Sequence, residues 1–139
     1  MHLTRHTDYS LRVLIYLALR PDKLSNVASI AGSFNVSRNH LVKVVHNLSR
    51  LGYIKSIRGH GGGIQLCADP DRVTVGEIVR QTEQSLEVIN CQQPECPILP
   101  ACKLKGALGQ ATNAFLDVLD DYTLADLVRQ KNRLGKLIA

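Results

Sequence analysis

Residues 37–52 read SRNHLVKVVHNLSRLG, and this stretch predicts an amphipathic α-helix. Its apolar residues recur at steps of 3, 1, 3 and 3, which place them along one side of a helix: Leu41, Val44, Val45, Leu48 and Leu51. Ser37 is a good N-cap residue and Gly52 a good terminator. The segments before and after this helix determine which fold it belongs to.

Two further helices are predicted upstream. In residues 9–20, apolar side chains repeat at helical spacing and stop before Pro21. Ser25 is expected to cap a second, short helix, and the stretch GSFNV at residues 32–36 is expected to break it. Two helices of about 8 and 13 residues joined by a tight turn form the helix-turn-helix pattern.

A β-hairpin is predicted directly downstream. YIKSIR at residues 53–58 alternates as a strand, GHGGG at 59–63 reads as a turn, and residues 64–66 return as a second strand. A phosphate-binding loop is the alternative for the glycine-rich stretch, but GHGGG lacks the Gly-Lys-Ser/Thr ending and does not open a helix. We therefore predict a mostly α fold with a small β-hairpin wing, a winged helix-turn-helix.

Charge is distributed unevenly along the chain. Residues 1–60 hold nine Lys or Arg against Asp8 and Asp22, a net charge of +7, whereas residues 61–139 hold eight basic and ten acidic groups, a net charge of −2. All five histidines also lie in the first part. A basic half joined to a slightly acidic half favours a polyanionic partner for the first half, with a merely solvated basic surface as the alternative.

Double-stranded DNA fits this partner, because the predicted third helix and wing carry groups that bind bases and phosphates. Arg, Lys and Asn can read base edges in the major groove, a helix N-terminus can meet a phosphate, and a glycine-rich wing can approach the minor groove. An ordinary polar surface is the alternative. The candidate DNA contacts are Ser37, Arg38, Asn39, His40, Lys43, Asn47, Arg58 and His60.

The second half predicts a connector helix, a loop and a long helix. Thr74 to Glu77 (TVGE) reads as a capping box, and Thr123 to Asp126 (TLAD) caps a final short helix. The tail at residues 129–139 is expected to fray. In the long helix, apolar residues recur at steps of 4, 3, 4 and 3 and form a seam along one side: Leu104, Leu108, Ala111, Phe115 and Val118. Such a seam predicts either core packing or, as we favour, the contact of a homodimer. We expect residues 1–72 to form the DNA-binding region and residues 73–139 the connector, loop and dimerisation helix.

The loop, NCQQPECPILPACKLKG at residues 90–106, carries Cys91, Cys96 and Cys102 in a C-x4-C-x5-C array. Its prolines keep it out of a helix. The spacing favours an iron-sulfur cluster over zinc, whose sites usually use tighter pairs, and over a disulfide. Cys67 stands apart on a strand and is expected to be a small buried residue. No signal sequence or apolar run of roughly 18 residues is present, so we expect a cytoplasmic protein without a membrane partner.

Together these residues resemble a known family. LTRHTDYSLRVLIYLAL (3–19), VSRNHLVKVVHNLSRLGYI (36–54), RGHGGGIQL (58–66), the cysteine array and YTLADLV (122–128) closely resemble NsrR-type nitric-oxide-sensing repressors, in the winged-helix iron-sulfur regulator family that includes IscR. The resemblance implies a homodimer whose cluster-loaded form binds a palindromic operator and whose nitrosylation releases it. It also implies that Cys91, Cys96 and Cys102 are cluster ligands and that Asp8 of the partner subunit is the oxygen ligand.

Several alternatives stay open at this point. Three thiolates and one further ligand fit a four-iron or a two-iron centre, and we expect the four-iron form. A zinc-loaded or redox-sensing winged-helix regulator is the nearest alternative, and a small electron carrier is another. An enzyme is not expected, because the sequence contains no supported Ser-His-Asp set, paired carboxylates or phosphate loop. Without a cluster, Asp8 is expected to pair with Arg12 four residues on.

Overall fold

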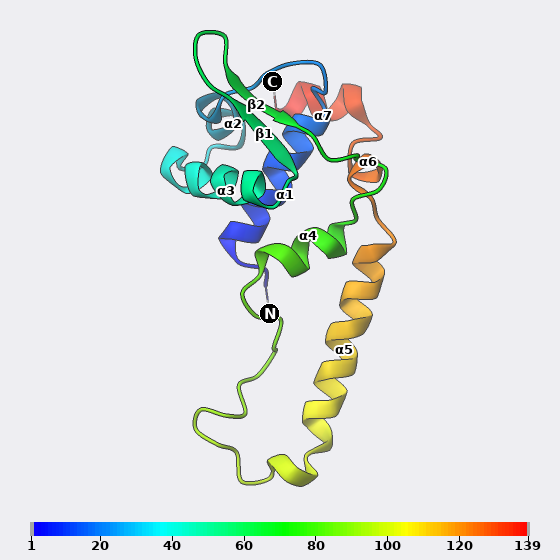
Figure 1. Ribbon diagram of the computed structural model, residues 1–139. Helices are drawn as coiled ribbons and strands as arrows, with labels where there is room; N and C mark the ends of the chain where they lie inside the picture. The colour runs from blue at the N-terminus through cyan, green and yellow to red at the C-terminus, as the bar shows by residue number, and fades with distance from the viewer. Residues whose placement is uncertain (1, 139) are drawn as a thin grey trace.

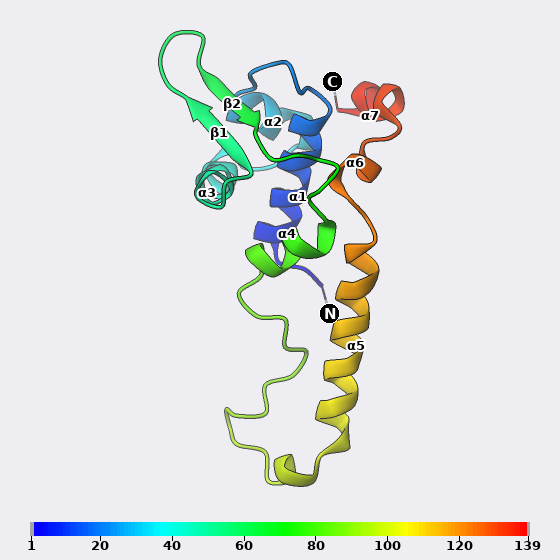
Figure 2. The ribbon, with the colours of Figure 1, turned by 45° about the vertical axis from the view of Figure 1, so that its right-hand side comes forward.

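The computed structural model describes residues 2–138, which form a mostly helical fold with one antiparallel hairpin (Figure 1). In chain order the elements are α1 (Arg5–Ala18), α2 (Val27–Phe34), α3 (Arg38–Arg50), β1 (Ile54–Ile57), β2 (Gly63–Leu66), α4 (Val75–Thr82), the 3-10 helix η1 (Leu99–Ala101), α5 (Lys103–Asp120), α6 (Leu124–Leu127) and α7 (Lys131–Leu137). Figures 1 and 2 show α5 extending away from the other helices, with the loop that follows α4 at its far end.

The predicted helix-turn-helix is confirmed in α2 and α3. Asn35 adopts a left-handed conformation (φ 51°) that ends α2, and Ser37 occupies the N-cap of α3. Leu41, Val44, Val45 and Leu48 are buried, as the apolar stripe requires. Gly52, with φ 85°, terminates α3 and turns the chain toward the wing, a backbone conformation that other residues rarely adopt.

The predicted start of the second helix is wrong by one residue, and the helix ends within the stretch 32–36 that was expected to break it rather than before that stretch. Asn26, not Ser25, is the N-cap, and its side chain accepts a hydrogen bond from the Ser29 N–H. Ser25 instead pairs with Ile64 through two backbone hydrogen bonds of 2.7 and 2.9 Å, so it extends the edge of the hairpin. The helix also continues through Gly32 to Phe34, because one glycine weakens a helix by only about 1 kcal/mol.

The wing is confirmed, with a first strand two residues shorter and a second strand one residue longer than predicted. β1 and β2 pair antiparallel with Ile54 opposite Leu66 and Ile57 opposite Gly63. Ile54 and Ile64 are buried and anchor the base of the hairpin, whereas residues 58–61 at its tip are exposed. The glycine-rich sequence thus produces a tip that projects from the core (Figure 2).

Helix α1 is the centre of the main hydrophobic core. Its Val13, Leu14 and Leu17 are at most 1% exposed, and they belong to one cluster with residues of α2, α3, β1, β2, α4 and α6. Burying a leucine contributes about 1.5–3 kcal/mol, so removing any one of these side chains would cost a large part of a typical domain stability. The core therefore fixes α3 and α4 relative to α1.

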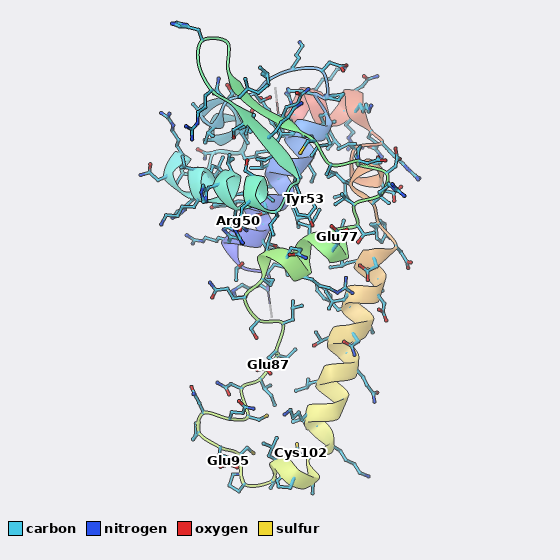
Figure 3. All side chains as sticks on the ribbon, viewed as in Figure 1. Arg50, Tyr53, Glu77, Glu87, Glu95 and Cys102 are labelled. Atoms are coloured by element: carbon cyan, nitrogen blue, oxygen red, sulfur yellow. The ribbon has the colours of Figure 1, made fainter. Side chains whose placement is uncertain are left out.

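Helix α4 is tied to α1 and to the base of the wing by polar contacts. Thr82 donates to Thr7 over 2.9 Å in the interior, and the Thr4 N–H donates to Glu83 Oε1 over 2.7 Å. The Tyr53 hydroxyl donates to Glu77 over 2.7 Å (Figure 3). Burial, followed by this bond to Glu77, raises the pKa of Tyr53.

The same bond explains why the predicted capping box at Thr74 forms only in part. The Thr74 side chain accepts from the Glu77 N–H, as expected. The Glu77 carboxylate, however, accepts from Tyr53 instead of returning to the Thr74 backbone. By contrast, the capping box at Thr123 and Asp126 is complete.

Asp120 joins the end of α5 to α4. Arg80 donates to both of its carboxylate oxygens at 2.7 Å, and Thr74 donates to one of them at 3.2 Å. The bond from Arg80 lowers the pKa of Asp120. Gly76 is required beside this contact, because a Cβ there would meet the Asp120 carboxylate and lie 3.0 Å from the Leu116 carbonyl.

The expectation that the tail frays is wrong. Residues 131–137 form α7, and Ile138 packs against the main core. The Arg20 guanidinium stacks over the Tyr16 ring at 3.9 Å and lies 3.5 Å from the Ile138 carbonyl. The apolar contact of Ile138 outweighs the fraying tendency of a short, basic terminal segment.

Helix α5 leaves most of its predicted seam uncovered in the single chain. Leu116 is its one buried residue, whereas Leu104 is 60% and Val118 57% exposed. Ala111 is also exposed, and Leu108 and Phe115 are half-buried. Among residues 2–138, every helix is too short or too polar to cross a bilayer.

The contact between Glu83 and Thr4 predicts a pH-dependent stability difference. Burial acts to raise the pKa of Glu83, but hydrogen bonds from Thr7 and Thr4 outweigh it and hold the pKa below its usual value. Such a carboxylate stabilises the fold above its unfolded pKa, and the contribution is lost as the pH falls through the folded pKa. Glu83→Gln should lower the free energy of unfolding by about 1 kcal/mol at pH 7, a melting-temperature decrease of about 4 °C.

The difference from wild type should narrow as the pH falls below the ordinary glutamate value of about 4.3. It should disappear only below the lowered folded-state pKa, where the wild-type carboxyl is protonated as well. Calorimetry between about pH 2.5 and pH 7 measures it. Glu87→Gln is the matched control, since the Glu87 side chain makes no hydrogen bond within residues 2–138. Equal melting temperatures of wild type and Glu83→Gln at pH 7 would show that the contact does not stabilise the fold.

Candidate DNA-binding surface and cysteine loop

The outer face of α3 presents the predicted base-reading groups to solvent. Arg38, Asn39, His40 and Lys43 are exposed, and Val42, between them, is 49% exposed. The buried stripe on the opposite side holds the helix against α1, so these side chains project outward from a fixed support. A helix with this arrangement can enter a major groove with its first turns.

The N-terminus of α3 is also free to meet a phosphate. Ser37 occupies the N-cap and is exposed, but its side chain makes no capping hydrogen bond. The amide groups of the first helical turn have no intrahelical acceptor, and they carry the positive end of the helix dipole. A DNA phosphate can satisfy both the hydroxyl and the amides.

Asn47 differs from the other candidates because its side chain is already bound. Its Oδ1 accepts from Arg50 over 2.8 Å, and its Nδ2 lies 3.1 Å from His6 Nε2 on α1. The residue is half-buried. Asn47 therefore links α3 to α1 in this structure, and it must give up these bonds before it can contact a base.

The wing adds a second basic element on the same side of the molecule as α3 (Figures 1 and 2). Arg58 and His60 are exposed at its tip, and Lys55 is exposed on β1. No Asp or Glu occurs between residues 23 and 68. The helix and the wing thus form a basic surface without acidic groups of their own, which suits the phosphate backbone of DNA.

The cysteine loop, defined here as residues 90–102, holds three cysteines that form no disulfide within residues 2–138. Cys91 is buried, Cys96 and Cys102 are half-buried, and all three are free. Cys91 and Cys96 are joined through the backbone, since the Cys96 N–H donates to the Cys91 carbonyl over 3.0 Å. Cys102 is the N-cap residue of α5, at the positive end of that helix (Figure 3).

The loop does not assemble a closed metal site by itself. Within residues 2–138, no three His, Cys, Asp or Glu side chains lie close enough together to hold a metal ion. Asp8 is on α1, apart from the loop, and its Oδ1 accepts from Arg12 Nε over 2.8 Å, the pairing expected from the sequence. The donor chemistry of three free thiols suits iron, and the loop must close for them to converge.

Cys67 is exposed rather than buried, which corrects the expectation for this residue. Its thiol donates to the Gly52 carbonyl over 3.1 Å, just beyond the end of β2. The sequence placed it on a strand, but the strand ends at Leu66 and the residue is exposed.

Two residues that the sequence analysis did not single out connect α1 to the helices beside it, α4 and α3. Glu83 binds the N-cap of α1, and His6 contacts Asn47 across 41 positions of the chain. Glu83 lies outside the stretches that carry the family resemblance, and His6, although it lies within residues 3–19, had no predicted contact. Only the fold brings them to their partners, so sequence spacing offered no signal for either.

Comparison with known proteins identifies the family. The model of the Rrf2 family, described as an iron-dependent transcriptional regulator, matches residues 3–130. The chain belongs to the Rrf2 family. It is 49% identical to the HTH-type transcriptional regulator NsrR of Bacillus subtilis (strain 168), over 99% of this chain and 97% of that protein. It is 43% identical to NsrR of Bacillus licheniformis, with 100% of both chains covered.

Solved structures of Rrf2-like regulators have the same fold. IscR of T. potens superimposes with a TM-score of 0.76 at 25% identity, covering 94% of this chain and 88% of that one. CymR, the global cysteine regulator of B. subtilis, gives a TM-score of 0.72 at 30% identity, covering 91% and 95%. The predicted winged-helix fold and the resemblance to NsrR are confirmed, and the chain is a transcriptional regulator rather than an enzyme.

Two asparagines on α3 differ in their surroundings, because Asn47 is hydrogen-bonded to α1 whereas Asn39 is exposed. Asn47→Ala removes the link between α3 and α1 and should lower the free energy of unfolding by about 1 kcal/mol. Asn39→Ala removes an exposed side chain and should leave stability unchanged while weakening binding to an operator duplex. Thermal melts and fluorescence anisotropy measure the two effects. An Asn47→Ala protein as stable as wild type would show that the link does not support the surface.

Proposed function

We propose that this Rrf2 regulator is a nitric-oxide-sensing repressor that binds a palindromic operator as a homodimer through α3 and the wing. The observation that carries the proposal is the combination, in one chain, of an exposed basic surface without acids and a separate loop of three free cysteines. The sequence identity of 49% to the NsrR of Bacillus subtilis, over 99% of this chain, supports the proposal. Residues 1–72 would form the DNA-binding region and residues 73–139 the sensing and dimerisation region.

The sensing group would be an iron-sulfur cluster held by Cys91, Cys96 and Cys102, with a four-iron form favoured. When bound, the cluster supplies iron atoms that react with nitric oxide. The chain contributes three thiolates from a loop whose closure is not opposed by a disulfide. The N-terminus of α5 favours a negative ligand at Cys102.

The fourth ligand would be Asp8 of the partner subunit. Within one chain, the cysteine loop lies at the far end of α5, away from α1 (Figures 1 and 2), and no group of three metal-binding side chains forms within residues 2–138, so Asp8 does not join its own cysteines. Its side chain is 42% exposed, and its one ion-pair partner within residues 2–138 is Arg12, whose side chain is 41% exposed. Such surface ion pairs contribute about 0–1 kcal/mol, which leaves Asp8 available to a stronger ligand bond.

A chain of side chains leads from Asp8 to the DNA-binding surface. Arg12, the partner of Asp8, lies over the rings of Tyr9 (5.9 Å) and Phe34 (5.8 Å). The Tyr9 ring in turn lies 6.2 Å from the ring of His40 on α3. If Asp8 changed its partner from Arg12 to the cluster, the position of Arg12 and of the rings it contacts would change, and with it the position of His40 on the recognition helix α3.

The exposed seam of α5 would form the dimer contact. Leu104 and Val118 lie at its two ends and are mostly exposed in the single chain. A dimer must present its two recognition helices about 34 Å apart to reach successive major grooves, so a small rotation of either subunit weakens both sets of contacts. A tie between the loop of one subunit and α1 of the other would set that spacing.

The ligand assignment is tested with single variants. Anaerobically reconstituted Cys91→Ala should lose the visible absorption of the cluster and bind operator DNA at least about tenfold more weakly, a difference of about 1.4 kcal/mol. Asp8→Ala should retain absorption but lose much of the operator affinity. Addition of nitric oxide should weaken wild-type binding. Equal operator affinities of Asp8→Ala, Cys91→Ala and wild type would contradict the coupling.

The dimer contact is tested by placing charge on the seam. Leu104→Glu combined with Val118→Glu should convert the protein to a monomer in analytical ultracentrifugation, because burying two unpaired carboxylates at an apolar contact is costly. Gln110→Glu, on another face of α5, should remain a dimer. A Leu104→Glu, Val118→Glu protein that stays dimeric would place the interface elsewhere.

A further inference from the structure

We propose that the pocket between the first turns of α1 and α3 binds a backbone phosphate of the operator. The pocket has a volume of about 290 Å³ and is lined by Arg5, His6, Tyr9, His40, Lys43 and Val44. This inference rests on the proposed DNA-binding function and adds α1 to the surface that carries it.

The pocket lining has the composition of an anion site. Four of its six residues are basic and none is acidic. Arg5 and Lys43 are exposed, and neither forms an ion pair within residues 2–138. Val44, 1% exposed, forms an apolar floor. A phosphate placed there would be met by two permanent cations and by polar groups from two helices.

Arg5 occupies a position that the helix itself disfavours. It is the first residue of α1, where the helix dipole is positive and an acidic residue is preferred. Its guanidinium offers five donors in a fork that matches phosphate oxygens. A bound phosphate would offset the unfavourable placement, because it would be attracted by both the dipole and the side chain.

His6 supplies a further donor. Arg50 can only donate, so the Asn47 Oδ1 that accepts from it fixes the orientation of the amide. Asn47 Nδ2 is therefore the group 3.1 Å from His6 Nε2, and Nε2 must accept. The ring proton then lies on Nδ1, which has no hydrogen-bond partner within residues 2–138 and can donate to a phosphate oxygen.

The pocket is continuous with the surface proposed to read DNA. His40 and Lys43 line it and also lie on the exposed face of α3. The contact between Tyr9 and His40 joins its two walls. A duplex seated on α3 would thus present its sugar-phosphate edge to α1.

This placement gives α1 two roles in one helical turn. Asp8, the proposed cluster ligand, lies between the pocket residues His6 and Tyr9 in the sequence. Any shift of that turn when Asp8 changes partner would move the phosphate pocket directly. DNA affinity would then depend on cluster state through a contact in α1, in addition to the spacing of the recognition helices.

The test is the salt dependence of operator binding by the cluster-loaded dimer. Arg5→Gln should weaken binding about fivefold at about 150 mM salt and reduce the slope of log K against log salt by about 1 per subunit, because one phosphate contact is lost. The loss should be the same for operator and for unrelated duplexes, since a phosphate contact carries no sequence information. Lys131→Gln on α7 is the matched control and should retain the wild-type slope.

Three results would overturn the proposal. The first is an Arg5→Gln protein with wild-type affinity and slope while Arg58→Gln is weakened, which would leave DNA binding intact and exclude the pocket. The second is an Arg5→Gln protein that no longer binds inorganic phosphate in calorimetry but binds the operator as tightly as wild type. That result would show that the pocket binds a free anion and not the DNA backbone. The third is absence of any operator binding by wild type, in which case the proposed function fails as well.

Discussion

The burial of helix α1 is the constraint on which the rest of the structure depends. Val13, Leu14 and Leu17 fill the core shared by the helix-turn-helix, the wing and the connector helix α4. Because this half of α1 is fixed, its N-terminal turns are held against α3 on one side and against α4 on the other, through Asn47 and Glu83. The proposed sensor ligand and DNA-binding groups therefore stand on one rigid support.

Weak interactions at the surface of this support are what make a switch possible. The pair between Asp8 and Arg12 is more than 40% exposed on both sides, so it can be exchanged at little cost. The contact between Thr7 and Thr82, by contrast, lies in the interior, where the Thr82 hydroxyl is also bound to the Ile78 carbonyl and the Thr7 hydroxyl to Thr4, so this network is not exchanged with solvent. A change of partner at Asp8 would accordingly be transmitted through α1 as a rigid element rather than absorbed by local unfolding.

Local patterns predicted most of the fold. The stripe of α3, the glycine at its end, the alternating wing strands and the complete capping box at Thr123 follow from spacing and residue type. Where the prediction was wrong, a contact with a residue distant in the sequence was the cause. Ser25 pairs with Ile64, so Asn26 becomes the N-cap of α2, and Glu77 accepts a hydrogen bond from Tyr53 instead of completing its capping box. The tail that was expected to fray is held in place because Ile138 packs against the core. For the site, the exposed face of α3 was predictable, whereas the capture of Asn47 by His6 was not.

The central claim is that a cluster on the cysteines of one subunit is completed by Asp8 of the other. A mixed dimer tests it most directly, with Asp8→Ala in one subunit and Cys91→Ala in its partner, reconstituted anaerobically with iron and sulfide. If ligation crosses the dimer, this species contains one intact set of four ligands. It should then hold one cluster per dimer with the wild-type visible circular dichroism and resistance to chelators. If its cluster instead matches that of the Asp8→Ala homodimer, Asp8 does not act across the interface and the account is contradicted.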